Sequence, residues 1–412
     1  MIPRSILLIV LGLLTVCGSC GRPPYRTAEL PVGVAPTVRL KLGEYRGTAR
    51  FSSQGPSLVE CWRAGQLVDR FYGAFELNVA LSGGGLSLMD ENLGGLARRL
   101  SKIAFLPGSN PAKFQFQGKT YRGNLEIICS RETTSFTAIN ELDIESYLKG
   151  VLPAEMGKRL PEEYEALKAQ AVAARTYALY KLQNQKGDNR YLHATVLDQV
   201  YQGYDSEMQL SNRAVEETRG QVLTYRGQLI CAYYHAICGG STEDVSNVWG
   251  GKQEAYLTSV PDGDFCSWAK TYLWQESFTA EELLEKVVSH SRAENLKWPR
   301  ERDSLKSVEI LSRMKSGRVR ELLIETASHK YILKSDDIRW ALNRTEGEIR
   351  ILASTLFEMT LRRDSSGNII SVDFFGRGKG HGVGMCQCGA IGRSRKGYDY
   401  DHILKSYYTG AH

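Results

Sequence analysis

The spacing of hydrophobic residues changes near Leu142, and this change limits the fold classes open to the chain. Between about residues 38 and 135, short apolar runs are separated by turn signals such as the glycines of residues 82–85. Strand-like runs lie at residues 75–81, 114–117 and 125–129. After Leu142, apolar residues recur at helical spacing, and strand patterns return at about residue 221. We therefore predict an α+β fold, with a β-rich N-terminal region and helices grouped in the middle.

Two helices are predicted after this change. The first covers residues 143–150, with Asp143 as its N-cap and Pro153 close to its end. The second covers about residues 161–185 and has three glutamates in its first turn, where the helix dipole favours negative charge. Its buried face is expected to consist of Leu167, Ala171, Ala174, Ala178 and Leu182.

The N-terminus has the pattern of an export signal. Residues 5–16 are almost wholly apolar and too short to span a bilayer, and small residues precede Cys20. Residues 1–20 are predicted to be a signal peptide of lipoprotein type, with Cys20 lipidated; a plain secretory signal is the alternative. Residues 21–37 would be a tether. We expect an exported protein, anchored to a membrane and facing the periplasm or wall.

The charge and the cysteine content limit which binding partners and which cysteine chemistry we expect. The net charge of +6 is spread thinly without a Lys/Arg block, so we expect no nucleic-acid partner. Nine cysteines are present, and seven remain once Cys17 and Cys20 are set aside. An odd number cannot all pair within one exported chain, so a free thiol or a metal site is expected.

Three separated segments contain unusual polar residues. The first joins Pro153-Ala-Glu-Met156 to Lys168-Ala-Gln-Ala-Val-Ala-Ala-Arg-Thr-Tyr177. The second is Tyr233-Tyr-His-Ala-Ile-Cys-Gly-Gly-Ser-Thr242, with residues 255–262 and Cys266 after it. The third is Gly380-His-Gly-Val-Gly-Met-Cys-Gln-Cys-Gly-Ala390, followed by residues 400–410.

Together these segments resemble the SpoIID/LytB family, over about residues 121–412. We therefore expect a β-rich region at residues 38–120 and a SpoIID-like α+β region with a central cleft at 121–412, including an inserted subdomain at about 278–350. The family contains lytic transglycosylases acting on glycan strands stripped of stem peptides, and enhancers of a wall amidase. The resemblance implies cleavage of the MurNAc–GlcNAc bond, with Glu155 as general acid and base and a 1,6-anhydro product.

Glu155 fits this chemistry on its own terms. Its neighbours Pro153, Ala154 and Met156 are apolar, and burial there would raise its pKa toward that of a usable acid. A solvated glutamate at a helix end is the competing interpretation. No second carboxylate is obvious nearby, which suits a transglycosylase better than a hydrolase. A non-catalytic glycan-binding enhancer of an amidase and a zinc amidase are the other functions considered.

The same resemblance makes Lys168, Gln170, Arg175 and Tyr177 candidates for orienting Glu155 or for binding sugar and carboxylate groups. His381 and Gln387 are expected to line the cleft, and all six are predicted to bind substrate. The four on the predicted helix have a structural alternative, in which alanines allow tight packing and the polar residues face water. The chain departs from the family where Cys386 replaces the usual serine and Cys388 the usual tyrosine. Any role of that serine or tyrosine in sugar binding is therefore in doubt here.

The cysteines leave three interpretations open. His235, Cys238 and Cys266 have plausible spacing for a structural zinc, with Cys386 or His381 as the fourth ligand. A Cys238–Cys266 disulfide would also suit an exported protein. In the third interpretation, His235 is a cleft residue without a metal. The glycan chemistry itself requires no cofactor.

Overall fold

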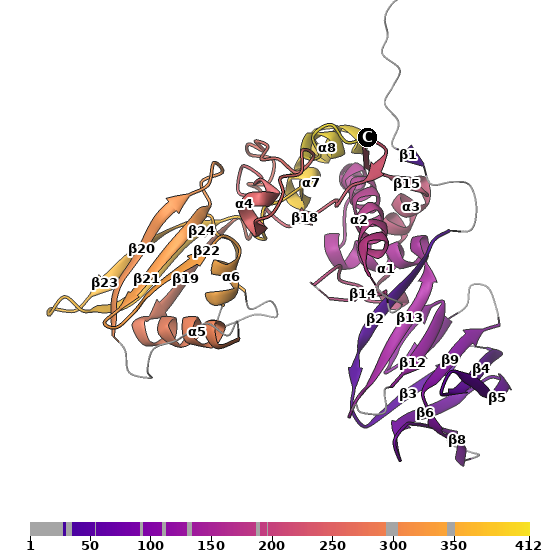
Figure 1. The fold of residues 1–412 in the computed structure, drawn as a ribbon. Helices are drawn as coiled ribbons and strands as arrows, with labels where there is room; N and C mark the ends of the chain where they lie inside the picture. Colours follow the sequence, from indigo (N-terminus) through magenta and orange to yellow (C-terminus); the bar gives the residue numbers. More distant parts are fainter. Residues whose placement is uncertain are drawn as a thin grey trace, which may run out of the picture.

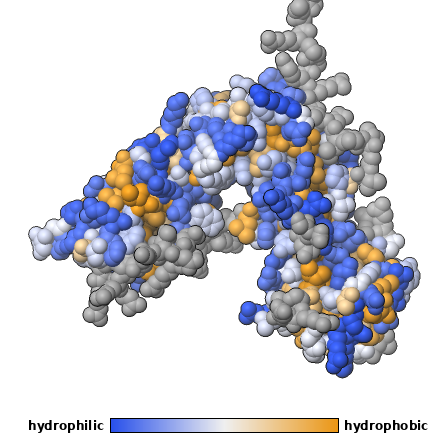
Figure 2. Space-filling model, viewed as in Figure 1, coloured by the Kyte–Doolittle hydropathy of each residue, from blue (hydrophilic) through white to orange (hydrophobic). Residues whose placement is uncertain are grey.

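The computed structural model describes residues 28–29, 35–53, 55–90, 94–108, 113–129, 134–186, 190–195, 197–293, 304–343 and 351–412. The predicted signal peptide, Cys20 and most of the predicted tether lie outside these residues. Two β-rich regions flank a central group of helices (Figure 1), and the space-filling view is hollowed between them (Figure 2). The predicted α+β fold is confirmed. None of the described helices is both long and apolar enough to cross a membrane.

The first β-rich region consists of two antiparallel sheets. Its strands are β2 (Thr37–Tyr45), β3 (Thr48–Ser53), β4 (Ser57–Arg63), β5 (Gln66–Gly73), β6 (Glu76–Leu81), β7 (Leu86–Asp90), β8 (Gly94–Leu100), β9 (Lys102–Pro107), β10 (Lys113–Phe116), β11 (Lys119–Arg122), β12 (Asn124–Ile128) and β13 (Phe136–Asp143). One sheet has the order β11-β10-β3-β6-β7-β8. In the other, β2-β13-β12-β9-β4-β5 are joined by the parallel strand β14 (Leu192–His193). Alternate residues point inward, as Leu125 and Ile127 do in β12.

The central region is helical. Its helices are α1 (Ile144–Met156), α2 (Tyr164–Asn184), α3 (Gln209–Glu217), α4 (Val245–Trp249), α7 (Gln387–Arg395) and α8 (Tyr400–Tyr407), with single turns at Pro161–Glu163 and Tyr204–Ser206. Its short strands are β15 (Gln221–Val222), which pairs with β1 (Ala28–Glu29), β16 (Thr224–Tyr225), β17 (Gln228–Leu229), β18 (Tyr234–His235) and β25 (Met385–Cys386). The parallel pair β18–β25 brings together two of the segments singled out in the sequence.

Helix α2 lies at the centre of this region. It contacts α1, α3, α7, α8 and β15, and every residue from Ala166 to Ala178 is buried except Lys168. The predicted buried face is confirmed at Leu167, Ala171, Ala174 and Ala178, and Leu182 is partly buried. The alternative, in which the polar residues of α2 face water, does not hold for Gln170 and Arg175. Small alanine side chains let the neighbouring helices approach from several sides, so polar residues of α2 are enclosed as well.

Helix α1 begins as predicted and ends later. The Asp143 side chain accepts the backbone N–H groups of Glu145 and Ser146, as an N-cap does. The helix then continues through Pro153 to Met156 and ends at Gly157, which has a φ of 64°. Burial of Val151, Leu152 and Met156 favours this extra turn over an ending before the proline.

The second β-rich region has a hydrophobic core of its own, from Phe278 to Phe374. Its elements are β19 (Leu273–Thr279), α5 (Ala280–Ala293), β20 (Leu305–Arg313), β21 (Val319–Thr326), β22 (Lys330–Lys334), α6 (Asp337–Ala341), β23 (Phe357–Arg363) and β24 (Ile369–Arg377). Strand β19 pairs along its whole length with residues 371–377 of β24, so the chain enters and leaves this region at adjacent points.

Candidate functional site

Glu155 lies in the last turn of α1, on a rigid support. The helix is anchored by the buried side chains of Tyr147, Leu148, Val151 and Leu152. Oε1 of Glu155 accepts a hydrogen bond from the backbone N–H of Val200 at 2.9 Å. Oε2 accepts one from Nε2 of Gln387 at 3.2 Å. Three segments distant in sequence therefore meet at this carboxyl group.

The environment of Glu155 favours its protonated form. Burial raises the pKa of Glu155, and the hydrogen bonds from Val200, Gln387 and Tyr234 offset part of that rise. Within the described ranges, no arginine, lysine or histidine forms an ion pair with it. A carboxyl group that is partly buried but not neutralised by a cation is suited to holding a proton and releasing it.

A buried chain of hydrogen bonds lies beside this carboxyl group. The Tyr147 hydroxyl donates to Oε1 of Gln199 at 2.9 Å, and Nε2 of Gln199 donates to the Tyr234 hydroxyl, also at 2.9 Å. Because Gln199 precedes Val200, this chain fixes the segment whose N–H group binds Glu155. Gln199 and Tyr234 were not predicted as site residues, although Tyr234 lies within the second segment.

The two predicted cleft histidines lie next to each other, with ring centroids 5.5 Å apart. His381 Nδ1 accepts the N–H of Val383, so its Nε2 carries the proton and donates to the Tyr234 carbonyl at 3.0 Å. Burial lowers the pKa of His381 to about 4. Its ring also lies 4.9 Å from the ring of Trp249, whose side chain is 44% exposed.

Of the substrate-binding residues predicted on α2, two have their side chains in the core. Arg175 is fully buried, and its Nε and Nη2 donate to the Glu145 carboxylate at 2.9 and 2.6 Å. Gln170 is also fully buried, and its amide has no hydrogen-bond partner in the described part of the chain. The expectation that Arg175 and Gln170 contact substrate directly is therefore corrected. Neither side chain reaches solvent, because α2 is enclosed by other elements.

The other two predicted residues of α2 are differently placed. Lys168 is partly exposed and forms ion pairs with Glu165 at 2.8 Å and Glu217 at 3.2 Å. Tyr177 is 6% exposed, packs its ring against Tyr234, and donates its hydroxyl to Asp198 at 3.3 Å. Tyr177 thus supports the wall of the site, whereas Lys168 is occupied by acidic residues.

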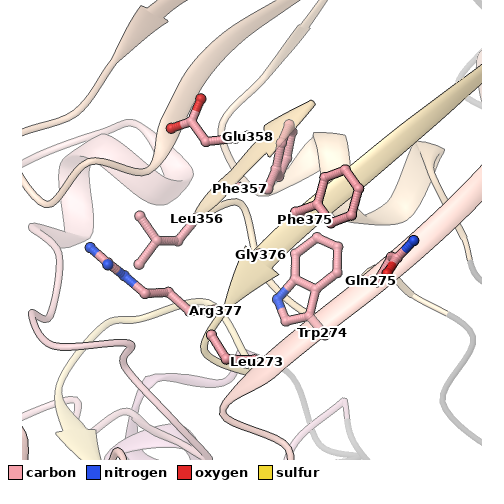
Figure 3. A pocket seen from close by; sticks show the side chains of 9 residues that line it. All are labelled: Leu273, Trp274, Gln275, Leu356, Phe357, Glu358, Phe375, Gly376 and Arg377. Carbon is pink, nitrogen blue, oxygen red and sulfur yellow. The ribbon is translucent and has the colours of Figure 1, made fainter. Parts of the chain in front are cut away.

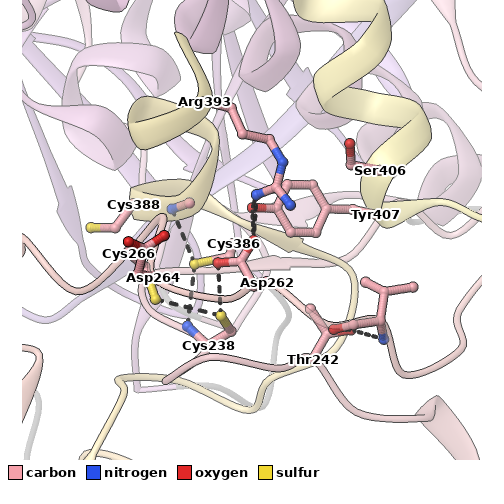
Figure 4. A network of polar contacts seen from close by, with 12 residues as sticks. Cys238, Thr242, Asp262, Asp264, Cys266, Cys386, Cys388, Arg393, Ser406 and Tyr407 are labelled. Carbon is pink, nitrogen blue, oxygen red and sulfur yellow. Dashed lines mark hydrogen bonds and ion pairs between the residues drawn. The ribbon is translucent and has the colours of Figure 1, made fainter. Parts of the chain in front are cut away.

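Three cysteines converge close to the start of α7. Cys238, Cys266 and Cys386 lie together with Asp262, and their four ligand atoms are all within 4.8 Å of one another (Figure 4). His235 does not belong to this cluster: its Nδ1 lies 3.1 Å from the Val383 carbonyl oxygen, which fixes the ring in another direction. The cluster therefore contains Asp262 in the place where His235 was predicted. The spacing Asp262-x-x-x-Cys266 was the available signal for it.

Three pockets of the described residues lie outside the Glu155 site, and two of them have aromatic side chains in their lining. One, of about 550 Å³, is lined by Trp274, Phe357 and Phe375 on the β19–β24–β23 sheet (Figure 3). The other, of about 570 Å³, has Trp249 and Trp340 in its lining. Because the Trp249 ring packs against His381, the second pocket adjoins the residues that lead to Tyr234 and Glu155.

Two family models match parts of this chain. The family described as "Stage II sporulation protein" matches residues 132–225, and a "Domain of unknown function (DUF8618)" matches residues 265–384. An uncharacterised protein of Brachyspira hyodysenteriae is 35% identical over 298 residues, which cover 72% of this chain and 73% of that protein.

Two relatives from Bacillus subtilis have descriptive names. The "Amidase enhancer" is 33% identical over 377 residues, covering 84% of this chain but 51% of that protein, so the match spans about half of it. "Stage II sporulation protein D" is 29% identical over 303 residues, covering 67% of this chain and 76% of that protein. The chain belongs to the SpoIID/LytB family.

Proposed function

We propose that this protein is a peptidoglycan lytic transglycosylase that cleaves the MurNAc–GlcNAc bond of glycan strands stripped of stem peptides. The observation that carries the proposal is the Glu155 carboxyl group, which is partly buried, has a raised pKa and lacks an ion-pair partner in the described part of the chain. Membership of a family that includes proteins named for sporulation and for amidase enhancement supports a role in the cell wall.

Glu155 would act twice in this reaction. Its protonated form donates the proton to the oxygen bridging the two sugars while the bond from that oxygen to the MurNAc anomeric carbon breaks. The 6-hydroxyl of the same MurNAc then attacks the anomeric carbon and loses its proton to the Glu155 carboxylate. The products are a 1,6-anhydro end and a free hydroxyl on the leaving strand, and Glu155 is protonated again.

The surroundings of Glu155 suit a mechanism with one carboxyl group. Its hydrogen-bond donors are a backbone N–H group and side chains that are uncharged at neutral pH. Asp198, two residues before Val200, accepts hydrogen bonds from Tyr177 and the backbone N–H of His193 and pairs with Lys181 at 3.1 Å. It is therefore not free to act as a second catalytic carboxylate, which a hydrolase would require.

The Glu155→Gln variant tests this proposal, because it keeps the shape of the side chain and removes proton transfer. With purified glycan free of stem peptides, we expect the wild type to release fragments with 1,6-anhydro ends, one water lighter than hydrolysed fragments. Release should fall by at least about 100-fold in the variant, the lower limit typical for loss of an acid–base group. Glu162→Gln, which changes an exposed glutamate in the same way, should leave release unchanged.

The second candidate function is a non-catalytic, glycan-binding enhancer of a wall amidase. The similarity to the B. subtilis amidase enhancer favours it. In that case Glu155→Gln would bind glycan and stimulate an added amidase as well as the wild type does, and no 1,6-anhydro fragments would form with either. Mass spectrometry of the digests separates the two functions.

We also propose that the protein is exported and held at a membrane by a lipid on Cys20. This follows from the apolar run of residues 5–16 and the small residues before Cys20. Labelling with a fatty-acid analogue should mark the wild type and not Cys20→Ala, and the variant should leave the membrane fraction. Unchanged membrane association of an unlabelled protein would contradict the anchor.

A further inference from the structure

The cluster of Cys238, Cys266, Cys386 and Asp262 has the features of a built site. All four residues are buried, and they come from three places in the chain: the loop after β18, the loop before β19, and the end of β25. In Figure 4 the three sulfur atoms and the Asp262 carboxylate face a common point below the first turn of α7. Nothing in the proposed glycan chemistry uses these side chains.

The separations suit a tetrahedral metal better than a disulfide. The sulfur atoms of Cys238 and Cys266 are 3.6 Å apart, and the Cys238 sulfur lies 3.0 Å from Oδ2 of Asp262. With zinc–sulfur bonds of about 2.3 Å, a tetrahedron has edges of about 3.8 Å. The two measured separations are slightly shorter than this edge, and the largest separation among the four ligand atoms, at most 4.8 Å, is slightly longer. A Cys238–Cys266 disulfide would use two of the three thiols and leave Cys386 buried beside it.

Backbone N–H groups point at the sulfur atoms. The Cys386 sulfur accepts hydrogen bonds from the backbone N–H groups of Cys238 and Gly389, both at 3.2 Å, and it forms the N-cap of α7. The Cys238 sulfur accepts one from the N–H of Gly240 at 3.4 Å. Donors of this kind and the positive end of a helix stabilise a thiolate, which is the form that binds metals.

Asp262 is held in place from its other side. Its Oδ1 accepts the Tyr407 hydroxyl at 2.7 Å and pairs with Arg393, which leaves Oδ2 directed at the cysteines. A ligating carboxylate that is itself hydrogen-bonded by outer residues is typical of metal sites.

The charges around the cluster also balance when a metal is present. Three thiolates and a carboxylate around Zn²⁺ leave a net charge of about −2. Arg393 contacts Asp262, and the fully buried Arg318 donates from Nη2 to the Cys238 carbonyl at 2.8 Å. Arg318 has no ion-pair partner within 4 Å in the described part of the chain, although a buried cation needs a nearby negative charge. An anionic metal centre beside Cys238 would supply that charge.

We propose that Cys238, Cys266, Cys386 and Asp262 bind one structural zinc ion. Thiolates favour zinc over magnesium or calcium, and four protein ligands close the coordination shell, so the metal would stabilise the fold without activating water. A closed site argues against a zinc amidase. The ion would fasten β25 and the start of α7 to two loops, and Gln387, which follows Cys386, would thereby be held against Glu155. The proposal does not depend on whether the protein cleaves glycan.

Metal content and spectroscopy of the purified full chain test this site. We expect about one zinc ion per chain, measured by elemental mass spectrometry against protein concentration. Replacing zinc by Co²⁺ should produce the sulfur-to-cobalt charge-transfer absorption and the intense visible bands of a tetrahedral thiolate site. Cys386→Ser should lose this absorption. Cys388→Ser, two residues further along and outside the cluster, should keep both the metal and the spectrum.

Two further variants test whether Asp262 or His235 is the fourth zinc ligand. Asp262→Asn should weaken zinc binding by at least 10-fold in competition with a chelator, whereas His235→Ala should retain stoichiometric zinc. If Cys386→Ser does not fold, alkylation of the wild-type protein still tests the site. Removing the metal with a chelator should expose the thiols of Cys238, Cys266 and Cys386 to alkylation. Less than about one tenth of an ion per chain after purification with zinc, or a Cys238–Cys266 disulfide found by peptide mapping, would overturn the proposal.

Discussion

Gln387 donates a hydrogen bond to one oxygen of the Glu155 carboxylate. This hydrogen bond affects the pKa of Glu155, the group that donates the proton in the proposed mechanism. A hydrogen bond to the ionised form lowers the pKa of Glu155, so Gln387→Leu should raise it further. Because the acid must be protonated at the start of the reaction, activity falls as pH rises through this pKa. The alkaline limb of the rate profile should therefore move to higher pH in Gln387→Leu.

The control for this prediction is Gln183→Leu, which removes an exposed carboxamide from α2 and should leave the profile unchanged. Initial rates of glycan release across the pH range, for both variants and the wild type, provide the measurement. An alkaline limb that stays in place in Gln387→Leu would mean that Glu155 is not the titrating acid.

Arg175 is expected to stabilise the fold and not to bind substrate. Its guanidinium and the Glu145 carboxylate form a buried pair, with side-chain exposures of 0% and 3%. Removing one partner leaves the other charge buried and alone, so Arg175→Ala should lower the free energy of unfolding by about 3–5 kcal/mol. Arg213→Ala, which breaks the exposed pair with Glu217, should leave the urea midpoint unchanged. An unchanged midpoint and a weaker affinity for glycan in Arg175→Ala would restore the role in substrate binding.

The sequence predicted where α1 and α2 begin but not what surrounds them. Asp143 has the signature of an N-cap, and that signature is local, so the start of α1 was correct. The extension past Pro153 depends on packing against other elements, which no local pattern reports. In α2, no local pattern shows that the stretch from Ala169 to Ala178 is enclosed on all sides, so Gln170 and Arg175, which the family resemblance assigned to substrate, lie in the core.

Gly150 in α1 determines how closely this helix approaches the segment that contacts Glu155. A Cβ atom at Gly150 would lie 2.5 Å from Cε2 of Tyr201, whose ring is already packed against Tyr147 with centroids 5.5 Å apart. Gly150→Ala should therefore displace Tyr201 and the adjacent Val200, at a cost of about 1–3 kcal/mol. Displacing the Val200 N–H group should also lower the rate of glycan release.

The control for Gly150 is Gly95→Ala in β8, where the new Cβ would lie at an ordinary 3.5 Å from Nη2 of Arg98. Chemical denaturation and initial rates measure the two effects separately. A Gly150→Ala variant with normal stability and normal activity would show that the contact between α1 and Tyr201 relaxes without moving Val200.

Across the whole chain, the sequence identified the residues that converge but not all of their partners. Three separated segments were expected to form one site, and Glu155 and Gln387 do meet. The sequence predicted a group of His235, Cys238 and Cys266 with Cys386 or His381, whereas the folded chain groups the three cysteines with Asp262 instead of a histidine. That choice depends on where β18 directs the His235 ring, and only the folded chain defines that direction.

A buried arginine of the second β-rich region lies beside the cysteine cluster. Arg318 follows the turn after β20, is fully buried, and donates to the Cys238 carbonyl at 2.8 Å. If the cluster holds an anionic zinc centre, Arg318 compensates part of its charge from a region with a separate core. Arg318→Met keeps a long apolar side chain and removes that charge. Zinc affinity should then fall by about 10–100-fold, the range found for outer residues of metal sites.

Competition with a chromophoric chelator measures this affinity, and Lys315→Met supplies the control, since it removes an exposed cation from the same turn. Lys315→Met should bind zinc as the wild type does. Equal zinc affinity for Arg318→Met and the wild type would mean that the second region does not stabilise the metal electrostatically, and that the charge of Arg318 is balanced elsewhere. A loss confined to Arg318→Met would instead couple the two regions through the zinc site and, through Cys386 and Gln387, to the carboxyl group of Glu155.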